Sequence, residues 1–247
     1  MYHIRYYNNN NNLMKTLVIH AAALKERGEH MDRMLKGFGM DYEIIKEGDL
    51  NDLDAQLMGR FFKDGATLQP TARHSCTAKH FLACEKIVAD DMEGALVLED
   101  DIVLDKDFVS LFEQSLTEYR EQYAAKNIII SYEDSALRFV PRSQRRKGQM
   151  LYPARKGRMA GCYFINGRAA KAIVEQLSVE RCHEPIDWYH NTLISKGILE
   201  CLWCQPTIAT QGTFSGAFVS SLNDDGRFVR LRWLFKKNYK KLLYWLR

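Results

Sequence analysis

The sequence lacks several features that would assign it to a common class of protein. No run of 18 apolar residues occurs in its 247 residues, so no conventional transmembrane helix is expected. Neither GxxxxGK[ST] nor GxGxxG occurs, which counts against a phosphoryl or nucleotidyl transferase built on a glycine-rich phosphate loop. Six scattered cysteines do not form the dense disulfide framework of a small secreted domain, so we expect a reducing, cytoplasmic location.

Two segments could be mistaken for a targeting signal and a metal site: residues 1–13, and the pair Cys201 and Cys204. Residues 1–13 contain an asparagine run in place of the apolar region of a signal peptide, and we predict a disordered extension with Met14 as the start of the fold. Cys201 and Cys204 have zinc-knuckle spacing. They lie in an apolar run that predicts a strand, where the two side chains point to opposite faces, so we expect no zinc knuckle.

Strand-like apolar runs alternate with amphipathic helices through most of the chain. Strands are predicted at 15–21, 42–46, 95–98, 127–131, 160–165 and 198–203, and helices within 31–39, 77–92, 107–123, 167–177 and 186–195. The basic, irregular segment 135–158 is predicted to be a long loop or lid. This alternation is typical of one α/β domain, residues 14–225, with a mainly parallel sheet flanked by helices.

Three consecutive carboxylates, Glu99, Asp100 and Asp101, follow the predicted strand 95–98. They emerge at the carboxyl end of that strand, the edge where open α/β sheets bind ligands. Adjacent anions repel one another unless a cation or a set of donors stabilises them. Carboxylate oxygens suit Mg²⁺ or Mn²⁺, which complete their shells with diphosphate oxygens and neutralise a leaving nucleoside diphosphate. The alternative is that Asp100 and Asp101 merely cap a turn.

Several motifs occur in a fixed order. They are Cys76-Thr-Ala-Lys-His80, Ala95-Leu-Val-Leu-Glu-Asp-Asp101, Ala160-Gly-Cys-Tyr-Phe-Ile165 with Arg168-Ala-Ala-Lys171, Pro185-Ile-Asp187-Trp-Tyr189, and Pro206 with Gln211, Ser215, Ser220 and Ser221. From about Met14 to Ser221 the chain thus resembles glycosyltransferase family 25, which contains lipooligosaccharide and collagen galactosyltransferases. It departs from the family's pattern at Ser75 (usually glycine), Lys79 (usually serine) and Arg27, which stands alone where several arginines are usual.

The resemblance implies a GT-A-like (Rossmann-like) fold, a UDP-sugar donor such as UDP-galactose, and a divalent cation, Mn²⁺ or Mg²⁺. Glu99 and Asp101 match the outer positions of the family's metal-binding acidic motif. Gln211 matches a C-terminal position that brings a ligand to the metal or the diphosphate. His80, on the helix before the acidic strand, is expected to contact the donor; the alternative is a core histidine with satisfied hydrogen bonds.

Two further candidates follow from their positions. Asp187 lies near the start of a helix after a proline and is placed to accept the proton of an acceptor hydroxyl, unless it only caps the helix. Arg158, with Arg155 and Lys156, is expected to meet the diphosphate charge, unless this basic run is only solvated.

The last 22 residues form a separate region of opposite charge. The chain carries a net charge of +4, but eight basic residues and no acid follow Asp225, which leaves the preceding residues at −4. Apolar residues recur at helical spacing along one face of this segment: Phe228, Leu231, Phe235, Tyr239, Leu242 and Leu246. A basic amphipathic helix at 226–247 is predicted, suited to an anionic membrane surface. The alternative is a helix packed on the domain or on a partner subunit.

The expected function is therefore a metal-dependent, inverting galactosyltransferase acting on a lipopolysaccharide or lipooligosaccharide acceptor. It would work as a peripheral protein on the inner face of the cytoplasmic membrane, with no nucleic-acid partner, because the acidic body would oppose a wrapped polyanion. Two other classes remain open: a metal-dependent nucleotidyl or phosphoryl transferase, and a non-catalytic membrane adaptor in which the tail is the function.

Overall fold

The structure, a computed structural model, describes residues 14–215 and 226–246 and centres on one mixed sheet. The strands of this sheet are β1 (Thr16–Ile19), β2 (Tyr42–Ile45), β3 (Gly94–Glu99), β5 (Ile128–Ser131), β6 (Leu151–Ala154), β7 (Cys162–Asn166) and β8 (Glu200–Cys204). Their order is β2-β1-β3-β7-β5-β8-β6. Strands β7 and β6 run against the other five, so the sheet is mostly parallel in direction.

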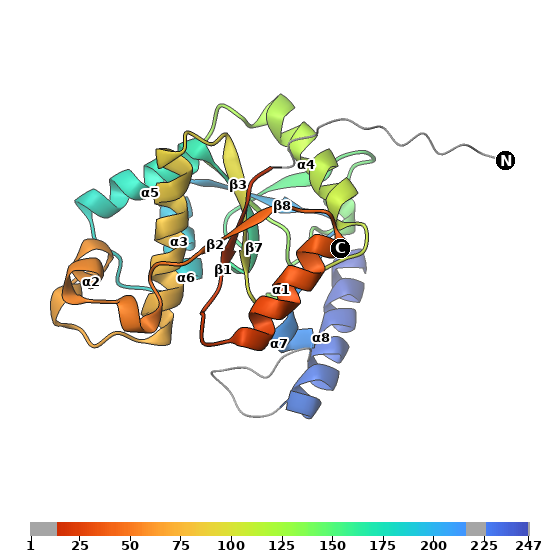
Figure 1. The fold of residues 1–247 in the computed structure, drawn as a ribbon. Helices are drawn as coiled ribbons and strands as arrows, with labels where there is room; N and C mark the ends of the chain where they lie inside the picture. Colours follow the sequence, from red (N-terminus) through yellow and green to blue (C-terminus); the bar gives the residue numbers. More distant parts are fainter. Residues whose placement is uncertain (1–13, 216–225, 247) are drawn as a thin grey trace.

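Helices cover both faces of the sheet (Figure 1). They are α1 (Lys25–Gly37), α2 (Ala55–Phe61), α3 (Ala72–Ala89), α4 (Phe108–Gln122), α5 (Gly167–Val179), α6 (Ile186–Ser195), α7 (Gly212–Ser215) and α8 (Gly226–Leu246), with 3-10 turns η1 (Leu50–Asp52), η2 (Gly65–Thr67) and η3 (Arg142–Gln144). The predicted α/β, Rossmann-like fold class is confirmed.

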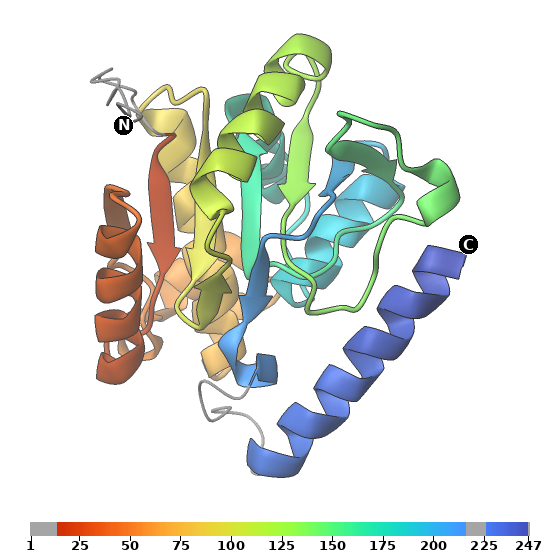
Figure 2. The same ribbon diagram turned by 90° about the vertical axis from the view of Figure 1, so that its right-hand side faces the viewer.

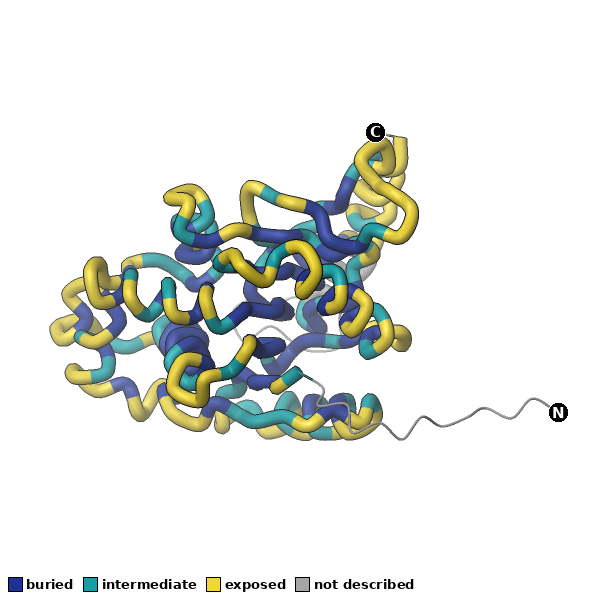
Figure 3. The backbone as a smooth tube through the Cα atoms, turned by 90° about the horizontal axis from the view of Figure 1, so that it is seen from above, coloured by how far each residue is buried: buried dark blue, intermediate teal, exposed yellow. Residues whose placement is uncertain are grey.

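Two apolar clusters hold these layers together, one on each face of the sheet. The first joins alternate strand residues such as Val97 to α2, α3, α5 and α6 through Phe61, Phe81 and Leu193. The second joins the other strand face, including Leu98, to α1 and α4. Seen from above, the strands form a buried centre and the outer sides of the helices are exposed (Figure 3). Because both faces are covered, the ends of the strands are the places where polar side chains can reach a ligand.

The sequence prediction missed three strands. A small second sheet pairs β4 (Ile102–Leu104) with β9 (Ala209–Gln211), immediately beyond the end of β3. The third is β6, which lies inside the segment predicted to be a loop and forms an edge of the main sheet. Its Pro153 is exposed, as expected for proline in an edge strand, and this proline masked the strand in the sequence.

Helix α8 lies alongside the segment that carries η3, away from the centre of the sheet (Figure 2). Trp233 is buried, Lys237 pairs with Asp134 at 2.6 Å, and the ring of Tyr244 meets the edge of Phe139. The opposite side of the helix is exposed, with Phe235 at 81%. Within the described residues, no helix is long and apolar enough to cross a bilayer.

Some predictions fall on residues that the structure does not describe. The extension 1–13, Ser220 and Ser221 lie outside the described residues. The side chains of Phe228 and Leu231, the first two members of the apolar stripe predicted for the tail, are likewise not described.

Candidate active site

The carboxyl end of β3 gathers side chains from α3 and β9 around Glu99. One carboxylate oxygen, Oε1, lies 3.3 Å from Nε2 of His80 and 3.6 Å from the sulfur of Cys76. The other, Oε2, accepts a hydrogen bond from the side-chain amide of Gln211 at 3.1 Å. Glu99 keeps about a fifth of its side chain exposed. The site is thus partly open at its central carboxylate.

Asp100 is a structural residue rather than a free ligand. Its two oxygens accept hydrogen bonds from Nδ1 of His20 at 2.9 Å and from Arg27 at 3.0 Å, and the backbone N–H of Ala21 adds a third at 3.3 Å. Burial alone would raise the pKa of Asp100, but the hydrogen bonds from His20 and Arg27 outweigh it and hold the pKa below its ordinary value. Asp100 therefore ties the end of β3 to the loop after β1.

Asp101 is buried but only half satisfied. Its Oδ2 accepts a hydrogen bond from the hydroxyl of Thr213 at 2.8 Å, and its backbone carbonyl accepts one from Gly212. Its Oδ1 is buried without a hydrogen-bond partner. Burial, together with the nearby charge of Glu99, raises the pKa of Asp101 to about 6. A cation beside Oδ1 would relieve both effects, so these residues fit a divalent ion.

Close backbone packing brings the C-terminal segment onto this strand end. Strand β9 pairs Gln211 with Ile102, directly after the acidic triplet. A Cβ atom on Gly161, at the start of β7, would come within 2.9 Å of both Nε2 of Gln211 and Cδ1 of Ile102. Only glycine at position 161 leaves the amide of Gln211 its place beside Glu99.

Glu133 is a buried acid of this edge that the sequence reasoning missed. Its Oε1 accepts hydrogen bonds from the backbone N–H groups of Gly161 at 2.7 Å and Cys162 at 3.2 Å, and its Oε2 has no partner at hydrogen-bond geometry. Burial raises the pKa of Glu133 to about 8, with a further contribution from Glu99 that the Ser135 hydroxyl opposes only in part. The signal was present, because Glu133 and Asp134 follow an apolar strand as the triplet does.

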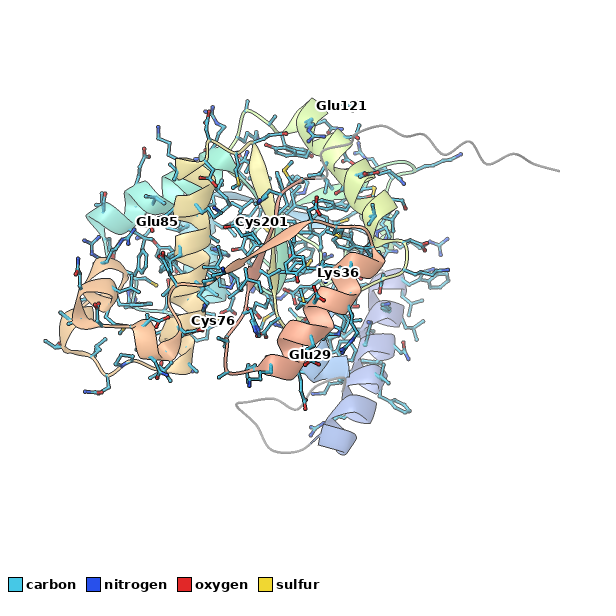
Figure 4. All side chains as sticks on the ribbon, in the orientation of Figure 1. Glu29, Lys36, Cys76, Glu85, Glu121 and Cys201 are labelled. Atoms are coloured by element: carbon cyan, nitrogen blue, oxygen red, sulfur yellow. The ribbon has the colours of Figure 1, made fainter. Side chains whose placement is uncertain are left out.

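His80 is fully buried and is fixed at both ring nitrogens. Its Nδ1 lies 2.8 Å from the hydroxyl of Tyr163, and the two rings stack. Its Nε2 faces Glu99, so its side chain reaches the strand end. Full burial with a partner at each nitrogen matches the alternative given for this residue, a core histidine with satisfied hydrogen bonds, and donor contact stays a prediction. Cys76, one helical turn earlier on α3, lies on the side of the helix that faces the strands (Figure 4). Among the described residues, Cys76, His80 and Glu99 are the one group of three acidic, cysteine or histidine side chains whose ligand atoms converge.

Asp187 lies in the first turn of α6, at the border of this site. The N-cap position of the helix is held by Pro185, and no side-chain capping bond is made there. Burial raises the pKa of Asp187, and the charge of Glu99 adds to this, while backbone N–H groups and Arg138 oppose it. Glu99 and Asp187 therefore lie within electrostatic range of each other, although no direct contact joins them.

The basic segment before β7 divides into a buried and an exposed part. Arg158 is 1% exposed, and its guanidinium donates to the backbone carbonyls of Arg138, Ser131 and Cys204. Burial lowers its pKa to about 10. Arg155 and Lys156 are exposed. Arg158 thus braces the backbone that leads into β7, and its neighbours carry the accessible charge.

Lys79 and Ser75, two of the three positions that depart from the family's pattern, have structural partners. Lys79, buried on α3, donates to the carbonyl of Ile45 at 2.8 Å and pairs with Asp49 at 3.2 Å. The hydroxyl of Ser75 donates to the carbonyl of Gly48 at 2.6 Å. Both residues fix the loop after β2 rather than the carboxylates.

This arrangement defines an α/β enzyme whose acidic site lies at the carboxyl ends of its strands, the place where such sheets bind nucleotides and their metals. The particular family follows from sequence comparison. A profile of glycosyltransferase family 25, described as an LPS biosynthesis protein family, matches residues 14–189, and the chain belongs to that family. No curated protein matches the chain. The protein is therefore a transferase of glycosyl groups, of the kind found in lipopolysaccharide biosynthesis.

Proposed function

We propose that the protein transfers galactose from UDP-galactose to a lipopolysaccharide or lipooligosaccharide acceptor, with inversion and with help from a divalent cation. The observation that carries this proposal is the buried, unpaired Oδ1 of Asp101 beside Glu99. In a family-25 chain, a half-satisfied carboxylate pair at the ligand-binding edge fits the cation that accompanies a nucleoside diphosphate.

Glu99 and Asp101 are the residues we expect to hold this cation, Mn²⁺ or Mg²⁺. When bound, the cation supplies positive charge to the departing diphosphate. Gln211 fixes one oxygen of Glu99, and Thr213 fixes Oδ2 of Asp101, so Oδ1 of Asp101 is the oxygen that presents a defined free side. His80 orients Glu99 from the other side and thereby contributes to the donor site.

Asp187 is our candidate for the base that removes the proton of the acceptor hydroxyl. Its partial burial raises its pKa, which makes the carboxylate a better proton acceptor than an exposed aspartate. Its place in the first turn of a helix rather than in a loop restricts the directions that this carboxylate can take. Exposed Arg155 and Lys156 are our candidates for meeting diphosphate charge, and Arg158 would serve by holding their segment.

Helix α8 is our candidate for contact with an anionic membrane surface. Its docked face fixes the helix to the body through Trp233 and Lys237. Its outer face carries exposed apolar residues that nothing in the described chain covers, namely Phe235, Tyr239, Leu242 and Leu246. Exposed lysines flank this face, among them Lys236 and Lys240. Apolar residues flanked by positive charge favour an interface bearing anionic lipids. Such an attachment would place the protein at the inner face of the cytoplasmic membrane, near a lipid-linked acceptor.

Calorimetry with a panel of nucleotide sugars, with and without Mn²⁺, tests the proposal. We expect UDP-galactose to bind tightly only with the cation, and Asp101→Asn to lose this metal dependence. Equal binding of free nucleoside triphosphate with transfer of a phosphoryl or nucleotidyl group would favour the rival enzyme class. Absence of any nucleotide-sugar binding, with vesicle binding intact, would favour the adaptor.

A further inference from the structure

A second set of metal ligands shares Glu99 but includes neither of the aspartates after it. Sγ of Cys76, Nε2 of His80 and Oε1 of Glu99 all lie within 4.8 Å of one another. Cys76 and His80 are spaced i, i+4 on α3, so both side chains project from one side of the helix. Glu99 approaches them from the end of β3. Two rigid elements therefore hold the three ligand atoms.

The spacing of these atoms fits a tetrahedral zinc ion. Bond lengths of about 2.0 Å to nitrogen and oxygen and about 2.3 Å to sulfur separate N from O by about 3.3 Å and S from O by about 3.5 Å. The observed distances are 3.3 Å from His80 to Glu99 and 3.6 Å from Cys76 to Glu99. Two of the three ligand separations therefore already match those of a bound zinc ion, and the third lies within 4.8 Å.

The surroundings of His80 are those of a metal-binding imidazole. Ligating histidines ordinarily donate their second N–H to a fixed oxygen, and here Nδ1 lies 2.8 Å from the hydroxyl of Tyr163. With the proton on Nδ1, the lone pair of Nε2 points at an oxygen of Glu99. A cation between the two acceptors removes that repulsion. Cys76 and Glu99 are only partly buried, which leaves a way in and a fourth position for water.

We propose that Cys76, His80 and Glu99 bind a zinc ion in the donor site of this enzyme. Thiolate and imidazole ligands select zinc over Mn²⁺ and Mg²⁺, which prefer oxygen. Zinc would hold one oxygen of Glu99 against α3. Since Glu99 is also a proposed ligand of the activating cation, zinc would inhibit transfer; this consequence rests on the proposed function, whereas zinc binding itself does not.

Cobalt substitution tests the site without any activity measurement. Co²⁺ is added to the full chain, and thiolate-to-cobalt charge-transfer absorption is followed; zinc is then titrated to displace it. We expect one equivalent to bind, and Cys76→Ser to lose the charge-transfer band and to weaken zinc binding by about 100-fold or more, the upper range for loss of a supporting residue. The matched control is Cys84→Ser, two turns further along the same helix. This variant should keep both the charge-transfer band and the wild-type affinity for zinc.

The cobalt band and its response to each variant either support the zinc site or overturn it. Lack of the band in the wild type, or equal loss in both cysteine variants, overturns the site. Melting temperatures without metal check that the variants fold. If Cys76→Ser unfolds, Glu99→Gln is used instead, and it must weaken zinc binding while keeping the cobalt–thiolate band.

The regulatory consequence is tested in transfer assays with Mn²⁺. Zinc should inhibit the wild type, and Cys76→Ser should resist zinc relative to its own zinc-free rate. Equal inhibition of the two proteins overturns the regulatory consequence, and absence of transfer in both contradicts the proposed function but leaves the cobalt result standing.

Discussion

The carboxyl edge of the sheet and the C-terminal helix leave opposite kinds of group unsatisfied. At the carboxyl end of β3, single oxygens of Asp101 and Glu133 are buried without a hydrogen-bond partner. On α8, the half-buried Lys237 is paired with Asp134, whereas the outer face exposes apolar side chains between lysines, with Phe235 the most exposed of the apolar ones. A ligand for the first region must bring positive charge or a proton, and a ligand for the second must bring apolar surface. The two regions therefore predict different partners for one molecule.

The contrast between the carboxyl edge of the sheet and α8 depends first on the need of Asp101 for a cation. Asp101→Asn should lower transfer to background, by about 10³-fold or more, because loss of a metal ligand removes several kcal/mol of charge stabilisation. The fold should survive, since an amide can still accept the hydrogen bond from Thr213. Steady-state rates and a melting curve check both statements. Near-normal turnover with Mn²⁺ still required would place the metal elsewhere.

Asp187 tests whether the rim of the same site carries out proton transfer. Asp187→Asn should lower kcat by roughly 10²–10⁴-fold while donor affinity changes little, the usual scale for losing a general base. Rates at saturating donor, together with donor binding by calorimetry, separate the two quantities. A lower melting temperature with unchanged specific activity would instead show that the carboxylate only stabilises the start of α6.

Glu133 allows the buried acids at the carboxyl edge of the sheet to be tested through the pH dependence of stability. Its pKa is raised to about 8, so the folded protein favours the protonated form; the resulting stability is complete below about pH 4.5 and is lost as the pH rises to about 8. Glu133→Gln fixes a neutral side chain, so its stability relative to the wild type should increase with pH by up to about 1.4 kcal/mol per unit in this window. Urea unfolding at pH 5, 6, 7 and 8 measures the difference. If the stabilities of the two proteins changed with pH in parallel, the raised pKa of Glu133 would be contradicted.

Lys237 tests the docked face of α8. Lys237→Met leaves the buried carboxylate of Asp134 without its ammonium partner, and the free energy of unfolding should fall by about 3 kcal/mol. Asp134→Asn in the same chain should restore most of the loss, because no buried charge then remains. Urea unfolding of the two single variants and of the double variant gives the coupling free energy between Lys237 and Asp134. A loss that the second substitution does not reduce would mean that Lys237 acts by packing on Trp233 instead.

Phe235 tests the exposed face and carries the smallest expected effect. Phe235→Ala should weaken binding to anionic vesicles by about tenfold, corresponding to partial burial of one aromatic side chain in the interface. The control is Val179→Ala at the end of α5, where an equally exposed apolar residue lies outside α8. Vesicle co-sedimentation at two salt concentrations measures both variants. If the two variants bound anionic vesicles equally well, α8 would not be the membrane-binding element.

The fold was largely predictable because the long helices and buried strands carry strong periodicity. Helix α6 was predicted at its observed bounds, and β3 within one residue at each end. The missed strands are short or unusual: β4 and β9 have three residues each, and β6 contains Pro153 at an edge. Local sequence cannot show such pairings, since the partners of β4 and β9 are distant in the chain.

The site was predictable at its centre and less so around it. Charge repulsion indicated the whole triplet as a ligand site, and the family resemblance selected Glu99 and Asp101 within it. Only the structure shows that Asp100 pairs with His20 and Arg27. No local pattern indicates that Arg158 faces inward, because a basic run in an irregular segment resembles a solvated surface. Nor could periodicity show that α8 has two apolar sides, one docked through Trp233 and one exposed through Phe235.

The hydrogen bonds that complete the acidic site also set the order in which it forms during synthesis. Gln211 and Thr213 each lie 112 residues after the carboxylate that they contact. At about 5–20 residues per second, the ribosome adds these partners roughly 6–22 s after the acids themselves. Until then Glu99 and Asp101 lack these two partners. The acidic site is therefore completed late, and a nascent chain halted before Ala209 would contain the sequences of the sheet's central strands but neither residue that closes the site.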